Sequence, residues 1–163
     1  MRNICLAVFA TVFSVAFAQP QAVKHASVIE ALRKAEPPVS KVIGLPPAPL
    51  SKAKDGVASR REIVAMFDQL FKHYQPKFRV TPRPYAVDSV AIEERNSDPT
   101  TRATLKKLVE WGFVSPVGPL VTNSTDTMTA AEFGDALGFF FTQALYVAHQ
   151  PDPRWTPDLG GGG

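Results

Sequence analysis

The stretch TLKKLVEWGFV, residues 104–114, decides the fold. Its apolar positions, with Leu105 and Leu108 among them, recur at the spacing of one helix face, and lysines lie between them. Gly112 can adopt the left-handed conformation that ends a helix, and Phe113 can then fold back against the last turn. Upstream, Asp98 is followed by a proline, which suits the cap and the first position of a helix. The stretch therefore predicts a helix that begins after Asp98 and stops at Gly112.

Two more helices are predicted by a repeated Ser/Thr-x-x-Glu pattern, the capping box, in which side chain and backbone of the first turn bind each other. Ser59 and Glu62 form one box, and Thr129 and Glu132 form the other. We expect the first of these helices to end before Pro76. The apolar residues behind the two boxes share one register: Ile63 with Phe133, Phe67 with Leu137, Leu70 with Phe140, and Phe71 with Phe141. This match indicates an internal repeat.

The first residues of the chain are typical of a signal peptide. A short basic start is followed by an apolar run and then by Ala16-Phe17-Ala18, a small-x-small cleavage pattern. We therefore predict a signal peptide over residues 1–18 and an exported protein. An uncleaved membrane anchor is the alternative, but the run is shorter than the ~20 residues that a spanning helix needs. The only cysteine, Cys5, lies inside the run, so the mature chain has no disulfide.

The mature chain divides into three parts. Residues 19–56 are expected to hold a short helix, Ala22–Ala35, followed by a linker, because residues 37–49 contain five prolines. Residues 57–147 carry the periodic patterns and are predicted to form a small all-α domain. Residues 148–163 are rich in proline and glycine and read as a flexible tail.

Charge is distributed unevenly along the mature chain. Residues 19–83 hold twelve basic and five acidic side chains, a net of 12 − 5 = +7, whereas residues 84–163 hold five and ten, a net of 5 − 10 = −5. A basic half can indicate an anionic partner, and two ordinary solvated faces are the alternative. No nucleic-acid-binding motif is present in the sequence, so we expect no nucleic-acid partner.

The helix at Leu105–Val114, the loop after it and the helix at Thr129–Phe141 together resemble one S-layer homology (SLH) motif. Ser59–Tyr74 resembles the second helix of a preceding motif, whose first helix would be Val28–Ala35 or absent. The resemblance covers about half of the mature chain. It implies SLH-like helix-loop-helix units, a surface location and no catalysis.

The resemblance also implies a ligand, because SLH domains attach bacterial proteins to polysaccharide linked to peptidoglycan. Arg60 matches the arginine that carries binding in the motif, and Gly112 matches a glycine that follows the first helix. The second copy has Ala130 in place of the arginine. From the residues themselves, Arg60 and Arg61 at a helix start suit an anion, and Trp111 could stack on a sugar ring. The expected role is thus attachment of an exported protein to the bacterial cell wall, in the periplasm or at the cell surface.

Other functions have less support in the sequence. The three histidines are far apart, no zinc or other metal pattern occurs, and no nucleophile elbow or phosphate-binding loop is present, so we expect no cofactor and no catalytic residue. A secreted hydrolase would need a clustered catalytic set around residues such as Asp126 or Glu132. The stronger alternative is an interaction or self-assembly module that has lost saccharide binding, forming a homo-oligomer or holding an envelope protein through Phe139 or Phe140.

Overall fold

The computed structural model describes residues 21–79, 98–123 and 125–149. The predicted signal peptide and most of the predicted tail lie outside these residues. The described part is all-α, as predicted, and has no named strand. Its elements are α1 (His25–Ile43), α2 (Arg60–Tyr74), the short 3-10 helix η1 (Gln75–Lys77), α4 (Pro99–Glu110), α5 (Pro119–Thr122) and α6 (Ala130–His149).

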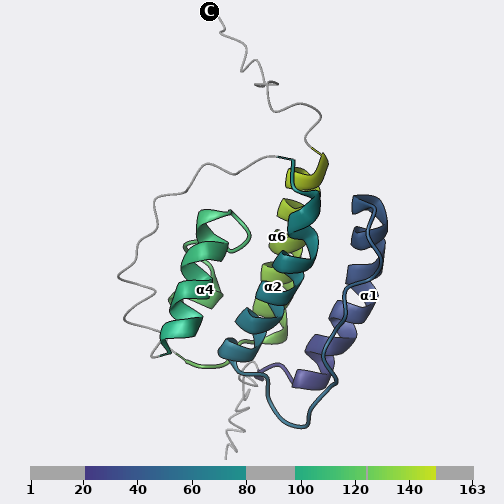
Figure 1. Ribbon diagram of the computed structural model, residues 1–163. Helices are drawn as coiled ribbons and strands as arrows, with labels where there is room; N and C mark the ends of the chain where they lie inside the picture. Colours follow the sequence, from purple (N-terminus) through teal and green to yellow (C-terminus); the bar gives the residue numbers. More distant parts are fainter. Residues whose placement is uncertain (1–20, 80–97, 124, 150–163) are drawn as a thin grey trace, which may run out of the picture.

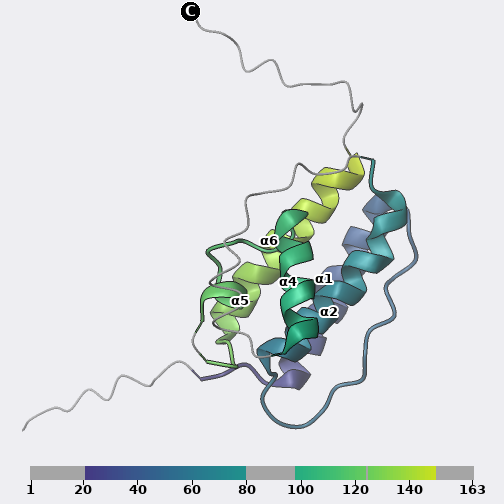
Figure 2. The same cartoon turned by 60° about the vertical axis from the view of Figure 1, so that its left-hand side comes forward.

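The long helices α1, α2 and α6 begin at the same end of the molecule and run in the same direction (Figure 1). The helix α4 lies beside α2 and is parallel to it, since Asp98 before α4 is close to Arg61 of α2, and Trp111 after α4 contacts Phe71 of α2. The short helix α5 lies beside the first half of α6 (Figure 2). The fold is thus a parallel bundle with one end formed by helix starts.

The two predicted capping boxes are both present. The Ser59 hydroxyl accepts from the amide of Glu62 at 3.2 Å, and the Glu62 carboxylate accepts from the amide of Ser59 at 3.0 Å. In the second box Thr129 and Glu132 make the same pair of bonds, at 3.2 and 2.8 Å. The matched apolar residues behind both boxes are buried: Ile63, Phe67, Leu70, Phe71, Phe133, Leu137, Phe140 and Phe141.

The helix α4 ends as its sequence predicts. Gly112 has a φ of 73°, which is the left-handed region. Its amide donates to the carbonyl of Val109 at 2.9 Å, and the amide of Phe113 donates to the carbonyl of Leu108 at 2.8 Å. These two bonds define a Schellman motif. At the other end, the Asp98 carboxylate accepts from the amide of Thr101 at 2.8 Å, so the predicted cap is confirmed too.

The two large apolar residues after α4, Phe113 and Val114, are buried in the core. The Phe113 side chain has no solvent exposure, and its ring lies 5.0 Å from the ring of Phe71 on α2 and 4.9 Å from the ring of Phe140 on α6. Both ring pairs meet edge to face, which is the favoured aromatic geometry. The stop at Gly112 therefore turns the chain so that Phe113 joins α4 to the two capped helices.

The prediction for the Pro-rich segment was wrong in its first part. We expected a helix over Ala22–Ala35 and a linker from residue 37, but α1 continues through Pro37 and Pro38 to Ile43. Each proline removes one amide donor, leaving the carbonyls of residues 33 and 34 without their helical partners. Those two residues are exposed, so water can bind the carbonyls, while the opposite face of α1 stays buried. Burial of that face outweighs the local preference of proline.

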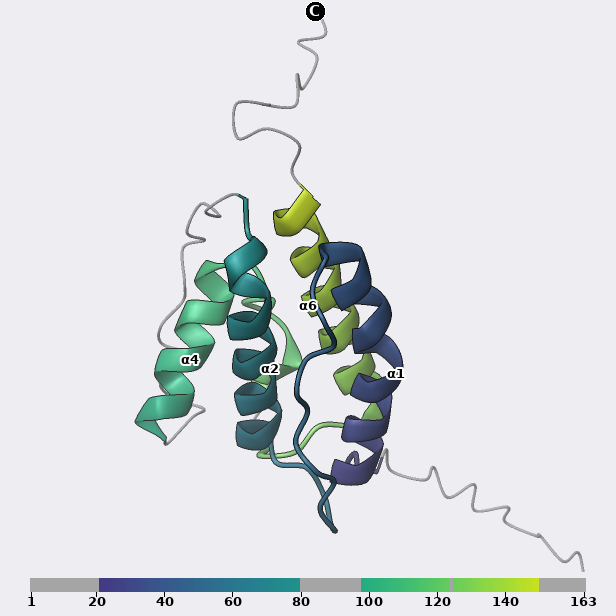
Figure 3. The ribbon, with the colours of Figure 1, turned by 45° about the vertical axis from the view of Figure 1, so that its right-hand side comes forward.

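The non-helical remainder, residues 44–56, is named the strap. It runs back along the bundle between α1 and α2 (Figure 3). Side chains of both helices bind its backbone. The Glu36 carboxylate accepts from the amide of Ala48 at 2.9 Å, the Gln69 side chain donates to the carbonyl of Pro49, and His73 binds the carbonyl of Pro46 at 2.9 Å. The predicted linker is therefore packed against the domain, which begins before residue 57.

Candidate functional site

The starts of α1, α2 and α6 are joined by a three-way junction, defined as residues 22–24, 57–59 and 127–129. Three isolated β-bridges form it: Ala22 with Thr129, Lys24 with Val57, and Ser59 with Thr127. Each segment pairs with both of the others. The central residues Val23, Ala58 and Met128 are all buried. The junction holds three helix starts, with their positive dipole ends, at one face of the molecule.

In the junction the start of α1 takes a position equivalent to the starts of the capped helices α2 and α6. Lys24 lies where Ser59 and Thr129 lie in the other two helices, and Val28 shares the register of Ile63 and Phe133. We expected the first helix of the preceding motif to be Val28–Ala35 or absent; in the junction α1 instead lies in the position of the helices α2 and α6. Lys24 gives no side-chain hydrogen bond to α1, so the capping signal was missing from this helix.

Arg60 is turned into the protein rather than towards solvent. The residue is only 4% exposed, and its guanidinium donates to the carbonyl of Asn123 at 2.5 Å. Its backbone amide donates to the carbonyl of Asp126 at 2.7 Å. Asn123 in turn donates from its side chain to Glu132 at 3.2 Å. In the structure Arg60 thus fastens the start of α2 to the loop before α6.

Arg61, the next residue, is the exposed arginine of this end. Its side chain is 70% exposed, and its guanidinium lies 3.9 Å from the carboxylate of Asp98. That carboxylate also caps α4 through Thr101, whose hydrogen bonds are the main cause of a lowered pKa of Asp98. The ion pair of Arg61 with Asp98 is long and exposed to solvent, so it is weak. The Arg61 guanidinium can therefore also contact an anion from solution.

Trp111 and Gly112 do not join the arginines. They lie at the end of α4, about 16 Å along the bundle from its start, for a helix with a rise of ~1.5 Å per residue. The Trp111 ring packs edge to face against Phe71 at 5.3 Å, and its carbonyl accepts from Gln143 at 3.0 Å. Gly112 serves the helix stop. The four residues predicted as a ligand site therefore occupy two places, and those of the second place pack and shape the core.

A pocket of mixed polar and apolar lining, which the sequence did not reveal, lies close to the first capping box. Its volume is about 160 Å³, and it opens between the strap and α2. The lining residues are His25, Ser51, Lys54, Glu62, Ala65, Met66 and Gln69. They come from α1, the strap and α2, and His25 is distant in the sequence from the others, so no single local spacing identifies the whole set.

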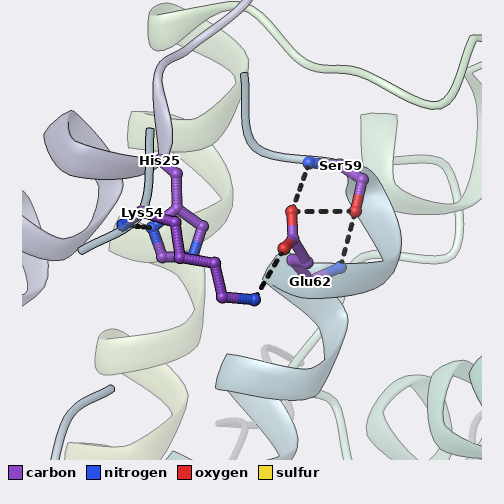
Figure 4. A network of polar contacts seen from close by, with 4 residues as sticks. All are labelled: His25, Lys54, Ser59 and Glu62. Atoms are coloured by element: carbon purple, nitrogen blue, oxygen red, sulfur yellow. Dashed lines mark hydrogen bonds and ion pairs between the residues drawn. The ribbon is translucent and has the colours of Figure 1, made fainter. Parts of the chain in front are cut away.

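His25 lines this pocket and is buried, with only 2% of its surface exposed. Its Nδ1 accepts a hydrogen bond from the amide of Lys54 at 3.1 Å, and the Lys54 ammonium lies 3.1 Å from the Glu62 carboxylate (Figure 4). The same carboxylate accepts from Ser59. The backbone bond from Ser59 is the largest cause of the lowered pKa of Glu62, with Lys54 acting in the same direction.

A second, apolar pocket lies between α6 and the segment that runs from the end of α4 into α5. It has a volume of about 190 Å³ and is formed by Val114, Ser115, Gly118, Pro119, Leu120, Asp135, Ala136 and Phe139. Phe139 is 47% exposed, whereas Phe140 is fully buried in the core. Of the two phenylalanines expected to support self-association, only Phe139 is accessible.

In the described part of the chain, no three His, Cys, Asp or Glu side chains are grouped closely enough to hold a metal ion. No helix among residues 21–79, 98–123 and 125–149 has the length and apolar character needed to cross a membrane. Comparison of the chain with protein-family models, with curated proteins and with solved structures finds no match.

Proposed function

We propose that this chain is a non-catalytic protein of the bacterial envelope that attaches to polysaccharide linked to peptidoglycan. The three-way junction is the observation that supports this proposal most directly. It brings three helix starts together around one point, two of them with a capping box, as expected for SLH-like units that share a core. The resemblance in the sequence involved two copies, and the junction adds the start of α1 to them.

The proposed attachment face is the end of the bundle at which the helices begin. Arg61 is exposed there, and the pocket beside Glu62 lies next to it along the first turns of α2. Lys52 and Lys54 of the strap are also exposed at this end. These cations and hydrogen-bonding groups fit a polymer that carries hydroxyl groups and negative charge.

Co-sedimentation with purified cell-wall sacculi tests the proposal. We expect residues 19–163 to sediment with sacculi that retain their polysaccharide and to stay in solution with stripped sacculi. Arg61→Ala should weaken binding, since it removes an exposed charge at the attachment face. Lys41→Ala is the matched control, because it removes one exposed charge from the last turn of α1 at the other end of the bundle. Equal sedimentation with both kinds of sacculi would contradict the proposal.

The alternative function, a protein-interaction or self-assembly module, is favoured by one observation. Phe139 and Tyr146 are exposed on the same face of α6, and Phe139 borders the apolar pocket. Exposed aromatic residues beside an apolar hollow are typical of interaction surfaces. In this case self-association measured by sedimentation velocity should disappear in Phe139→Ser and persist in Arg61→Ala.

A further inference from the structure

The apolar pocket between α6 and the segment that leads into α5 remains open among the described residues. Its volume is about 190 Å³, and its lining is almost entirely apolar, with Leu120 and Phe139 among the residues that form it. Phe139 is 47% exposed, and Val117, in the loop before α5, is 80% exposed. Exposed apolar side chains gathered beside a hollow are typical of a surface that binds another apolar group.

The exposed apolar surface continues along α6 towards the end of that helix. Tyr146 follows Phe139 by seven residues, so the two side chains lie on one face of α6, and Tyr146 is 58% exposed. We name these two residues the aromatic stripe. At a rise of ~1.5 Å per residue the stripe is about 10 Å long. It leads from the pocket to the last turn of α6, which ends at His149.

The part of the chain that follows His149 carries groups that match this surface. Residues 150–163 lie outside the described residues and have the sequence QPDPRWTPDLGGGG. Trp155 is their one aromatic residue, and Arg154 beside it is their one basic residue. The pocket has an exposed carboxylate, Asp135, beside its apolar lining. A large apolar ring next to a positive charge therefore complements both the shape and the charge of the pocket.

The length of the chain allows Trp155 to reach the pocket. Trp155 follows His149 by six residues, and six extended residues span up to ~20 Å. Phe139 precedes His149 by ten residues in α6, which is about 15 Å at ~1.5 Å per residue. Pro151 cannot donate the backbone hydrogen bond that would continue α6, so the chain can leave the helix axis there. The indole ring extends the reach of the backbone further.

Two considerations favour the chain's own C-terminal segment over a second copy of the protein as the occupant. A stable interface between two proteins involves about 20–30 residues on each side, whereas the pocket and the aromatic stripe offer only a few side chains. A segment joined to α6 by a short connection is also present at a millimolar effective concentration, which a second copy does not reach in dilute solution.

We infer that the segment after α6 folds back along this helix, that the Trp155 indole enters the apolar pocket beside Phe139, and that Arg154 pairs with Asp135. The C-terminal segment then covers the aromatic stripe and competes with any protein partner for Phe139. This intramolecular contact is independent of the proposed attachment through Arg61, so either can fail without the other.

Nuclear magnetic resonance of residues 19–163 tests the contact. In Trp155→Ala the methyl signals of Leu120 and the ring signals of Phe139 should shift, because both residues lose the ring current of the indole. Thr156→Ala is the matched control, since it changes the neighbouring residue, and it should leave these signals in place. Asp135→Asn should lower the equilibrium constant of docking about twofold, as for the loss of an exposed ion pair.

Two further measurements identify the occupant. The pocket signals should stay the same when the protein is diluted, since an intramolecular contact does not depend on concentration. Phe139→Ser should move the indole signal of Trp155 to the position it has in the urea-unfolded chain. Unchanged Leu120 and Phe139 signals in Trp155→Ala would overturn the inference, and so would equal shifts in Thr156→Ala. Pocket signals that change on dilution would also overturn it, because they would assign the pocket to a second copy.

Discussion

Ser59 and Thr127 form an antiparallel bridge that joins the start of α2 to the segment before α6. Ser59 also caps α2, so one residue serves both the helix and the junction. The bridge places the two capping boxes side by side although they are far apart in the sequence. Substitutions at these helix starts should therefore change the stability of the whole bundle.

Loss of either cap should destabilise the fold. Ser59→Ala and Thr129→Ala each remove an acceptor for a first-turn amide, and each should lower the free energy of unfolding by about 0.5–2 kcal/mol. Thr100→Ala is the control, because Thr100 is exposed in the first turn of α4. Urea denaturation followed by circular dichroism gives the values. Equal stability of Ser59→Ala and Thr100→Ala would contradict the role of the cap.

A side-chain cap introduced at the start of α1 should stabilise the fold. Lys24 has the extended backbone of an N-cap, with φ −75° and ψ 144°, but gives α1 no side-chain hydrogen bond. Lys24→Ser should therefore raise the free energy of unfolding by about 0.5–1 kcal/mol. Lys41→Ser provides the comparison, since it changes the same residue type at the end of α1. A stabilisation that is the same in both variants would point to charge rather than capping.

Replacement of glycine by alanine should have opposite effects on stability at different positions of the chain. Gly112 needs a left-handed backbone, so Gly112→Ala should destabilise the fold by about 1–2 kcal/mol. Gly134 and Gly138 lie inside α6, and a Cβ added there meets nothing within 4 Å. Alanine at either position should stabilise the protein by about 0.5–1 kcal/mol. Thermal unfolding of the three variants checks the signs. Destabilisation by alanine at 138 would mean that this face of α6 is covered in solution.

The capping boxes also predict a dependence of stability on pH. Backbone hydrogen bonds from Ser59 and Thr129 are the largest causes of the lowered pKa values of Glu62 and Glu132. A carboxyl whose pKa is lower in the folded state stabilises the fold above its unfolded pKa of ~4.3 and loses this contribution as pH falls through the folded pKa. Stability measured from pH 7 to pH 3 should therefore decrease.

Glutamine variants separate the boxes from the other carboxylates. Glu62→Gln should flatten the acid part of the profile, because glutamine can still accept from the Ser59 amide but does not titrate. Glu110→Gln is the control, since Glu110 is exposed at the end of α4 and belongs to neither capping box. An unchanged slope in Glu62→Gln would contradict the assignment of the acid dependence to this box.

Local signals in the sequence were sufficient for α2, α4 and α6. Their starts, and the stops of α2 and α4, depend on residues within one turn, such as Ser59 with Glu62 or Gly112 with Phe113, and the structure confirms these. The tail predicted from residue 148 begins too early, because α6 continues to His149. The course of α1 depends instead on burial of Glu36 and its neighbours against α2, which no local pattern records. There the Tyr74 hydroxyl donates to Glu36 at 3.1 Å, and burial raises the pKa of Tyr74.

The candidate site could likewise be predicted only where it depends on local sequence. The sequence indicated Arg60 because of its position after a cap, but its direction depends on the carbonyl of Asn123, which is distant in the sequence. His25 gave no signal, since its partner is the backbone amide of Lys54 in the strap. A side chain that binds backbone from another segment leaves no spacing to recognise.

The buried contact between α1 and α2 can be tested in the same way. Tyr74→Phe removes the hydroxyl that donates to Glu36 and leaves the ring in place. We expect a loss of about 0.5–1.5 kcal/mol, as for an ordinary intramolecular hydrogen bond. Tyr146→Phe is the control because Tyr146 is 58% exposed. Similar stabilities of the two variants would show that the hydrogen bond between Tyr74 and Glu36 does not stabilise the packing of α1 on α2.

Sedimentation with sacculi, with and without their polysaccharide, tests the central claim most directly. Attachment through the helix starts predicts that the chain sediments only with intact sacculi, that Arg61→Ala weakens this binding and that Lys41→Ala does not. A chain that remains in solution with intact sacculi, or that binds equally well after the polysaccharide has been removed, would contradict it.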